Sequence, residues 1–217
     1  MDIRVILIQI FVVLFAITIH EAAHAWTAAR FGDLTAAAMG RVSLNPIAHI
    51  DPFGTIIFPL LLIILSGGKG PVFGWAKPVP VNPNNLRQPR RNNLWISFAG
   101  PIANILAVGV AALLFQALKL ITRGVPESSV LVKPIDGLVM ILVYAAVINA
   151  ALAVFNLIPI PPLDGSGILT GLLSETAAAK YERLRPYGFF LLLILMYTNI
   201  LNAIFTPVQR LVLSLFR

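Results

Sequence analysis

The stretch Ile17-Thr18-Ile19-His20-Glu21-Ala22-Ala23-His24-Ala25-Trp26 decides how this chain folds, because it places ionisable side chains at the end of an apolar run. Residues four apart on a helix lie about 40° apart around its axis, so His20 and His24 share one face and can bind one metal ion. Glu21 is displaced around the helix, where it can act on water without being a ligand. Residues 5–19 carry no charge, so the motif is expected at membrane depth.

The composition indicates an integral membrane protein. Hydrophobic residues make up 58% of the chain and charged residues only 12%, whereas a soluble domain is about a quarter charged. The mean hydropathy is +0.87. We expect one membrane domain over residues 1–217, with its catalytic core at about 3–168 and no separate signal peptide. The net charge of +7 is interpreted as loop charges facing the cytoplasm and lipid head groups, with no nucleic acid as partner.

Four apolar segments are long enough to be transmembrane helices. They are Ile3 to Phe31, Leu94 to Ile121, Ile135 to Leu157 and Tyr187 to Phe205. The apolar run from Ile56 to Leu65 is half the length of about twenty residues that a span needs, so we expect a re-entrant or half-depth segment. The predicted fold class is an all-α polytopic membrane protein with small β or loop elements.

Proline, glycine and asparagine interrupt the helical pattern between the spans. Thr35 to Asn45 is expected to be a short strand or an irregular loop, and two prolines and a glycine exclude a regular helix over Asn45 to Thr55. Val79-Pro80-Val81 is a candidate edge strand. The remaining segments are a short amphipathic connection, Ser166 to Arg185, and a basic apolar tail, Pro207 to Arg217.

The loop Ser66 to Asn93 predicts the orientation, because it holds basic residues and no acid and basic loops face the cytoplasm. From the cytoplasmic side, the second span then crosses the membrane outward and the third span crosses back, which puts Asp164 near the cytoplasmic side. The first helix must also end on that side if His20 and His24 are to meet Asp164. A dedicated lipid or partner site in this loop is the second interpretation.

The chain contains no cysteine, so a catalytic zinc, which takes three protein ligands and one water, must find its third ligand among His, Asp and Glu. Asp164 is the best candidate, because it follows a Pro-x-Pro-Pro sequence at the end of the third span. A metal ion would remove the cost of burying its carboxylate. A role as a helix N-cap or turn residue is the alternative for Asp164.

Three pieces of sequence together resemble the site-2 protease family of intramembrane zinc metalloproteases. The first is His20-Glu21-Ala22-Ala23-His24, and the second is Gly100-x-x-x-Asn104 in the second span. The third, Asn156-Leu157-Ile158-Pro159-Ile160-Pro161-Pro162-Leu163-Asp164-Gly165, looks like that family's N-x-x-P-x-P-P-L-D-G signature and is the most specific of the three.

The resemblance implies that His20, His24 and Asp164 bind one Zn²⁺ per chain and that Glu21 is the catalytic acid and base. Asn104 and Asn156 would lie beside the site. The chain departs from the pattern at Ala23, where family members often have Gly. It has no room for the accessory domains that many members carry, so it resembles a minimal form of the family.

Four residues have structural roles as open alternatives. Gly100 could serve only close helix packing and Asn104 only interhelical hydrogen bonding. Asn156 could satisfy backbone groups freed by Pro159. His49 is open among a zinc ligand, a residue beside the site or in a substrate loop, and a structural residue of its own turn.

The sequence therefore predicts an integral membrane zinc endopeptidase that cuts transmembrane or membrane-proximal segments of membrane proteins. We expect it in a prokaryotic cell membrane, in contact with lipids and with its active site toward the cytoplasm. Asn104, Asn156 or a strand from Arg41 to Pro80 would hold the unwound substrate. The alternatives are a transporter or channel with broken helices and a metal-dependent scaffold that binds membrane helices without cutting them.

Overall fold

The computed structural model describes residues 3–65, 74–126 and 128–217. Within these ranges, three helices are long and apolar enough to cross a membrane: α1 (Ile3–Arg30), α4 (Pro89–Ile121) and α5 (Val132–Asn156). These match the first three predicted spans to within a few residues. The described part of the chain consists of helices and connecting loops without a strand, so the predicted all-α class is confirmed.

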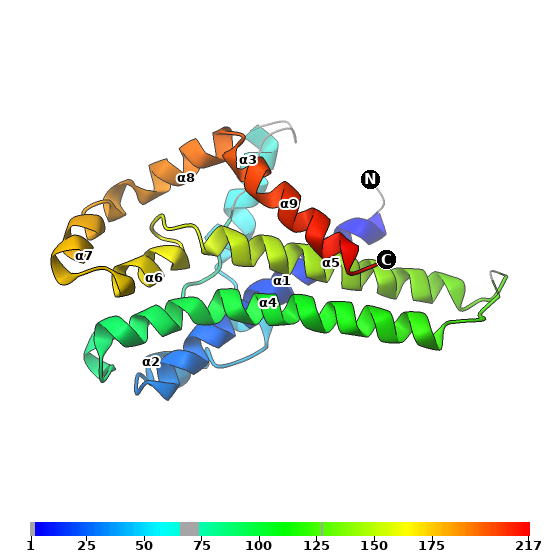
Figure 1. Ribbon diagram of the computed structural model, residues 1–217, viewed down its shortest axis with the longest axis horizontal. Coiled ribbons are helices and arrows are strands. Elements are labelled where there is room, and N and C mark those ends of the chain that lie inside the picture. Colours follow the sequence, from blue (N-terminus) through cyan, green and yellow to red (C-terminus); the bar gives the residue numbers. More distant parts are fainter. Residues whose placement is uncertain (1–2, 66–73, 127) are drawn as a thin grey trace.

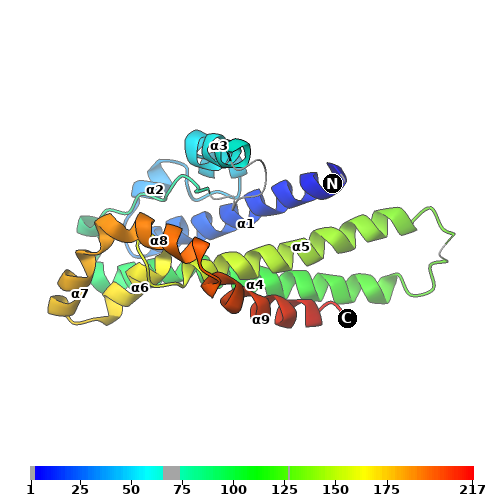
Figure 2. The same cartoon turned by 90° about the horizontal axis from the view of Figure 1, so that it is seen from above.

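Helices α4 and α5 form a long antiparallel hairpin, and α1 packs against both of them (Figures 1 and 2). Small residues allow this close approach: Ala146 of α5 is fully buried and lies with Ala111 and Ala150 in a cluster that also includes Leu142 and Val212. Alanine at helix contacts lets backbones come close where lipid supplies no hydrophobic driving force. Most large apolar side chains outside these contacts are exposed, as expected for surfaces facing lipid.

The short apolar segment is a side element of the helical bundle. A π-helix, η2 (Pro52–Ile57), leads into α3 (Phe58–Leu65), and Figure 2 shows α3 standing apart from the α4–α5 hairpin. Together they rise about 21 Å, less than the roughly 30 Å of the hydrocarbon core. A 3₁₀ helix, η1 (Pro46–His49), precedes them, so the backbone before the segment is irregular, as the prolines predict.

The last third of the chain differs from the prediction. Helices α6 (Asp164–Leu172) and α7 (Glu175–Glu182) form the expected connection, and the short η4 (Arg185–Tyr187) follows. The expected span is broken into α8 (Gly188–Tyr197) and α9 (Ile200–Ser214). The stretch Glu175–Tyr197, which includes α8, and α9 are bent by 68° relative to each other. At the break Thr198 is extended, and its hydroxyl donates to the Leu195 carbonyl at 2.8 Å. The predicted tail is part of α9.

The two candidate strand segments contain no strand in the described residues. Thr35–Ala38 is instead a helical turn, α2, and η3 (Pro83–Asn85) follows the 79–81 segment. Buried Asp33 joins these two regions, because its carboxylate accepts from the Asn82 N–H at 2.6 Å and the Asn85 side chain at 2.9 Å. Burial opposes ionisation of Asp33, but hydrogen bonds from Thr35, Asn85 and Asn82 outweigh it and lower the pKa of Asp33 to about 2.

Candidate metal centre

The two histidines of the first motif lie one turn apart on α1 and face the same point. Their ring centroids are 4.6 Å apart in an edge-to-face arrangement, and their Nε2 atoms are 3.1 Å apart. Both side chains are buried. The i, i+4 spacing on a helix therefore produces the arrangement that the sequence predicts.

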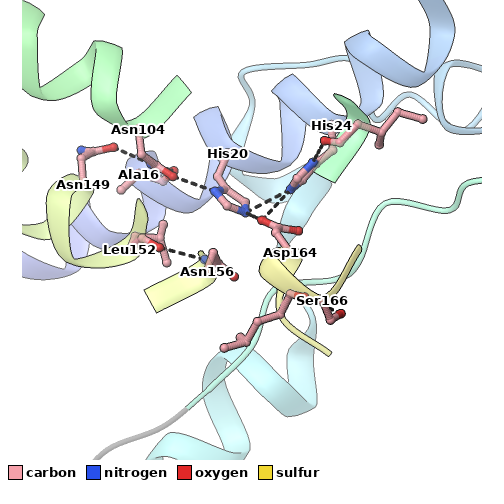
Figure 3. Close-up of polar contacts among 11 residues, drawn as sticks. Ala16, His20, His24, Asn104, Asn149, Leu152, Asn156, Asp164 and Ser166 are labelled. Atoms are coloured by element: carbon pink, nitrogen blue, oxygen red, sulfur yellow. Dashed lines mark hydrogen bonds and ion pairs between the residues drawn. The ribbon is translucent and has the colours of Figure 1, made fainter. Parts of the chain in front are cut away.

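Asp164 reaches the same point from a distant part of the chain. Helix α5 ends at Asn156, and after the proline-rich turn Asp164 is the first residue of α6. Its Oδ2 lies 2.9 Å from Nε2 of His20 and 3.3 Å from Nε2 of His24 (Figure 3). Gly165 is required here, because a Cβ at this residue would lie 2.4 Å from the Leu157 carbonyl oxygen.

These three side chains fit a zinc ion. Ligand atoms at about 2.0–2.1 Å from a tetrahedral zinc lie about 3.3 Å from one another, close to the three separations of 2.9, 3.1 and 3.3 Å. The Oδ2 of Asp164 is buried without a hydrogen-bond partner among the described residues, which a metal ion would satisfy. His20, His24 and Asp164 offer three protein ligands within 4.8 Å, which leaves a fourth position for water or substrate.

Hydrogen bonds to the far side of each ring fix the histidine tautomers. Nδ1 of His20 lies 2.6 Å from Oδ1 of Asn104, and Nδ1 of His24 lies 2.6 Å from the Ile96 carbonyl. Because both oxygens can only accept, both Nδ1 atoms must carry the proton. The lone pair of each Nε2 is then directed at the point where the ligands converge.

Asn104 is held by a second asparagine that sequence reasoning missed. Its amide donates to Oδ1 of Asn149 at 2.6 Å and to the Ala16 carbonyl at 3.2 Å. Asn149 on α5 in turn donates to the Ala145 carbonyl at 2.8 Å. The signal was available, since a buried asparagine inside an apolar span is costly unless it has partners.

Gly100 lies directly against the histidine rings. A Cβ at this position would be 2.5 Å from Nε2 of His24 and 2.6 Å from Cε1 of His20. The absence of a side chain is therefore what allows α4 to pack onto α1 at the height of the ligands. Close helix packing and proximity to the site, which the sequence left as alternatives, coincide here.

The other predicted site residues are placed differently. Glu21 is half-buried and has no hydrogen bond or ion pair among the described residues. Asn156 lies on the last turn of α5 and donates to the Leu152 carbonyl at 3.0 Å (Figure 3). His49 is outside the ligand group: it is buried, its Nε2 donates to the Ser43 carbonyl at 2.8 Å, and its Nδ1 has no partner in the described part of the chain.

Known proteins are similar to this chain over most of its length. The profile of peptidase family M50 matches residues 8–197. The protein named "Putative zinc metalloprotease YwhC" of Bacillus subtilis (strain 168) is 36% identical over 190 residues, which cover 88% of this chain and 80% of that protein. "Putative zinc metalloprotease Rip2" of Mycolicibacterium smegmatis is 32% identical over 194 residues, covering 88% of this chain and 67% of the relative. No solved structure matches.

Proposed function

This chain belongs to peptidase family M50, the family of the site-2 proteases, and from that premise we propose that it hydrolyses peptide bonds within or beside transmembrane segments of other membrane proteins. The resemblance inferred from the three sequence motifs is confirmed. The chain is an integral membrane zinc metalloprotease. The proposal concerns its substrates, its site residues and its use in regulated intramembrane proteolysis.

The depth of the ligand cluster is the observation that carries the proposal. His20 is seventeen residues after the start of α1, or about 25 Å along the helix axis, and α1 continues for ten residues beyond it, about 15 Å. The cluster is enclosed between α1, α4 and the start of α6. A hydrolytic centre at this depth favours a substrate segment that is itself in the membrane, and the basic loop after α3 supports a site nearer the cytoplasmic side.

We assign the chemistry as follows. His20, His24 and Asp164 would hold the zinc ion, which would supply Lewis-acid chemistry to the site. Glu21 has a carboxylate without a partner in the described residues, so it is available to accept the proton of the attacking water and to return it to the leaving amide nitrogen. A carboxylate at Glu21 would also be attracted to the zinc ion that the neighbouring His20 and His24 would hold.

The asparagines divide into two roles in this proposal. Both donors of the buried Asn104 amide are used, and its oxygen accepts from His20, so Asn104 positions His20 and has no donor left for a substrate. Asn156 has an amide oxygen without a partner in the described chain. A helical substrate must unwind before its carbonyls can be attacked, and Asn156 is placed to accept a freed backbone N–H.

The test is cleavage of a panel of single-span membrane proteins by the purified enzyme, with products located by mass spectrometry. We expect Glu21→Gln to keep stoichiometric zinc and to lose turnover, and Asp164→Asn to lose both. Glu175→Gln is the matched control, because it removes an exposed carboxylate on α7. Cleavage by wild type only in soluble loops would reject the substrate class, and full activity in Glu21→Gln would reject Glu21 as the acid and base. No cleavage of any substrate by zinc-loaded wild type would favour a transporter or scaffold.

A further inference from the structure

A cavity lies at the end of the molecule where α1 finishes and α4 begins. Its volume is about 330 Å³, and its charged lining consists of Arg30, Arg87 and Arg91. Phe31 and Trp95 line it as well. The proposed metal mechanism uses none of these residues. The three arginines come from the last turn of α1, from the segment before α4 and from the first turn of α4.

The positive charge of this cavity is not neutralised by the protein. In the part of the chain that the structure describes, Arg87 and Arg91 have no ion pair or hydrogen bond, and Arg30 contacts only the ring of Trp26, at 4.8 Å. Like charges that gather without a carboxylate are unfavourable unless an anion joins them. Arginine is also the side chain best suited to bind a phosphate through paired hydrogen bonds.

A buried amide supplies a second, independent indication of a ligand. Asn92 lines the cavity and is only 7% exposed, yet its side chain has no hydrogen-bond partner among the described residues. The polar atoms of this amide are not among the fully buried atoms without a partner, so they remain accessible and the side-chain N–H groups can donate to a ligand. Asn92 lies in the first turn of α4, whose N-cap residue Gln88 makes no side-chain cap, so the helix terminus adds positive potential at the same place.

The position of the cavity relative to the membrane identifies the kind of anion. Arg30 lies six residues beyond His24 and Arg91 five residues before Ile96, so both are about 8–9 Å from the ligand cluster along their helices, at the same end. Trp26 and Trp95 are half-exposed there, and tryptophan is enriched at the membrane interface. The cavity therefore opens at head-group level.

An apolar stripe continues from the cavity along α4. Trp95, Ile102 and Leu106 are exposed at 48%, 43% and 65%, and their spacing of seven and four residues puts them on one face of the helix. From Trp95 to Leu106 the helix rises about 16 Å, which is about half of the roughly 30 Å hydrocarbon core. The stripe thus has the length of one leaflet and suits an acyl chain below the basic cavity.

We propose that this cavity binds the phosphate of an anionic phospholipid, with Arg30, Arg87 and Arg91 as the anion ligands, Asn92 as a neutral donor, and the Trp95–Leu106 stripe in contact with an acyl chain. A lipid bound here bridges the C-terminal end of α1 and the N-terminal end of α4. These are the two helices that carry the zinc-binding histidines and Gly100.

The experiment is native mass spectrometry of the detergent-purified full chain, titrated with phosphatidylglycerol or with zwitterionic phosphatidylcholine. Wild type should retain phosphatidylglycerol in preference to phosphatidylcholine. Arg87→Gln/Arg91→Gln should weaken that binding about 30-fold, from two interfacial arginines. The charge-matched control Arg123→Gln/Arg183→Gln changes exposed arginines outside the cavity and should bind as wild type.

Two further arms separate the sources and the site. Asn92→Leu leaves the net charge unchanged and should also weaken phosphatidylglycerol binding, which diffuse surface charge does not predict; wild-type affinity in this variant would overturn the assignment to the cavity. Millimolar inorganic phosphate should fail to displace the lipid, and efficient displacement would show a free-phosphate site instead. The proposal would be overturned if the two double-arginine variants bound phosphatidylglycerol with equal affinity, or if wild type bound phosphatidylglycerol and phosphatidylcholine equally. Thermal unfolding confirms that each variant is folded.

Discussion

Replacing Gly100 by alanine adds one methyl group at the contact between α4 and the two histidine rings. The new Cβ would lie 2.5 Å from Nε2 of His24 and 2.6 and 2.7 Å from Cε1 and Nε2 of His20. Ordinary carbon contacts are about 3.5–4.0 Å, so the rings or the helices must separate by about 1 Å. Zinc sites keep their ligand distances within about 0.2 Å, so the ligand geometry cannot survive this shift intact.

We therefore expect Gly100→Ala to weaken zinc binding by about 10–100-fold, the range found when groups that orient metal ligands are changed. Overpacking should also lower the free energy of unfolding by about 1–3 kcal/mol. Zinc affinity is measured by competition with a chelator of known affinity, and stability by thermal unfolding in detergent with and without zinc. Activity toward a membrane substrate should fall in parallel.

Gly109→Ala is the matched control in the same helix. A Cβ at Gly109 meets nothing within 4 Å, so this variant should bind zinc as wild type does and gain about 0.5–1 kcal/mol from the helix propensity of alanine. If the two variants have equal zinc affinity, the close approach of α4 to the rings does not control the ligand geometry, and the argument fails.

Three further predictions follow from the contacts around the site. Asn149→Leu removes the acceptor for Asn104 and should lower zinc affinity about tenfold, measured by chelator competition; unchanged affinity would remove Asn149 from the positioning of His20. Removing zinc should lower the melting temperature of wild type and of Glu21→Gln equally, because we propose Glu21 as the acid and base and not as a ligand; a smaller shift in Glu21→Gln would make it a ligand. The pKa of Asp33 is lowered from 3.8 to about 2, so its ionised form stabilises the fold above pH 4 by about 2 kcal/mol. This stability should be lost as the pH falls toward 2. In Asp33→Asn, the free energy of unfolding should therefore change less with pH over this range.

The spans were predictable because their signal is simple. Long, strongly apolar runs predicted α1, α4 and α5, and the errors are confined to their ends. Helix α4 begins at Pro89, five residues before the predicted start at Leu94. The prediction started late because the first turn is polar and basic, and hydropathy does not detect such a turn. Proline at the first helical position is a better signal there than hydrophobicity.

The bend between α8 and α9 could not be read from the sequence. Thr198 and Asn199 lie inside a strongly apolar segment with no proline or glycine at the break, and both residues are tolerated in a transmembrane helix. Helix α9 packs against α5, a tertiary contact that no local sequence pattern specifies. The candidate strands failed for a related reason, since Asp33 holds both segments by side-chain hydrogen bonds instead of pairing.

In the metal centre, the spacing of His20 and His24 predicted their convergence because helix geometry is local. The convergence of Asp164 on the same point depends on how α6 returns to α1, which no local pattern specifies. Asp164 was named as a candidate from the missing cysteines and its proline-rich context, and the resemblance strengthened that choice. The role of Gly100 follows from how closely α4 approaches the histidine rings of α1, and this distance cannot be predicted from the sequence of α4 alone. Asn149 was missed because its partner Asn104 lies on a different span.

The ligands also set when the enzyme can become active during its biogenesis. His20 and His24 leave the ribosome early, but Asp164 follows them by 140 residues, after α4 and α5 have been made. A nascent chain therefore carries only an incomplete site while most of its helices are being inserted. With His20, His24 and Asp164 as the proposed ligands, a complete zinc site requires that Asp164 has been synthesised and has reached α1.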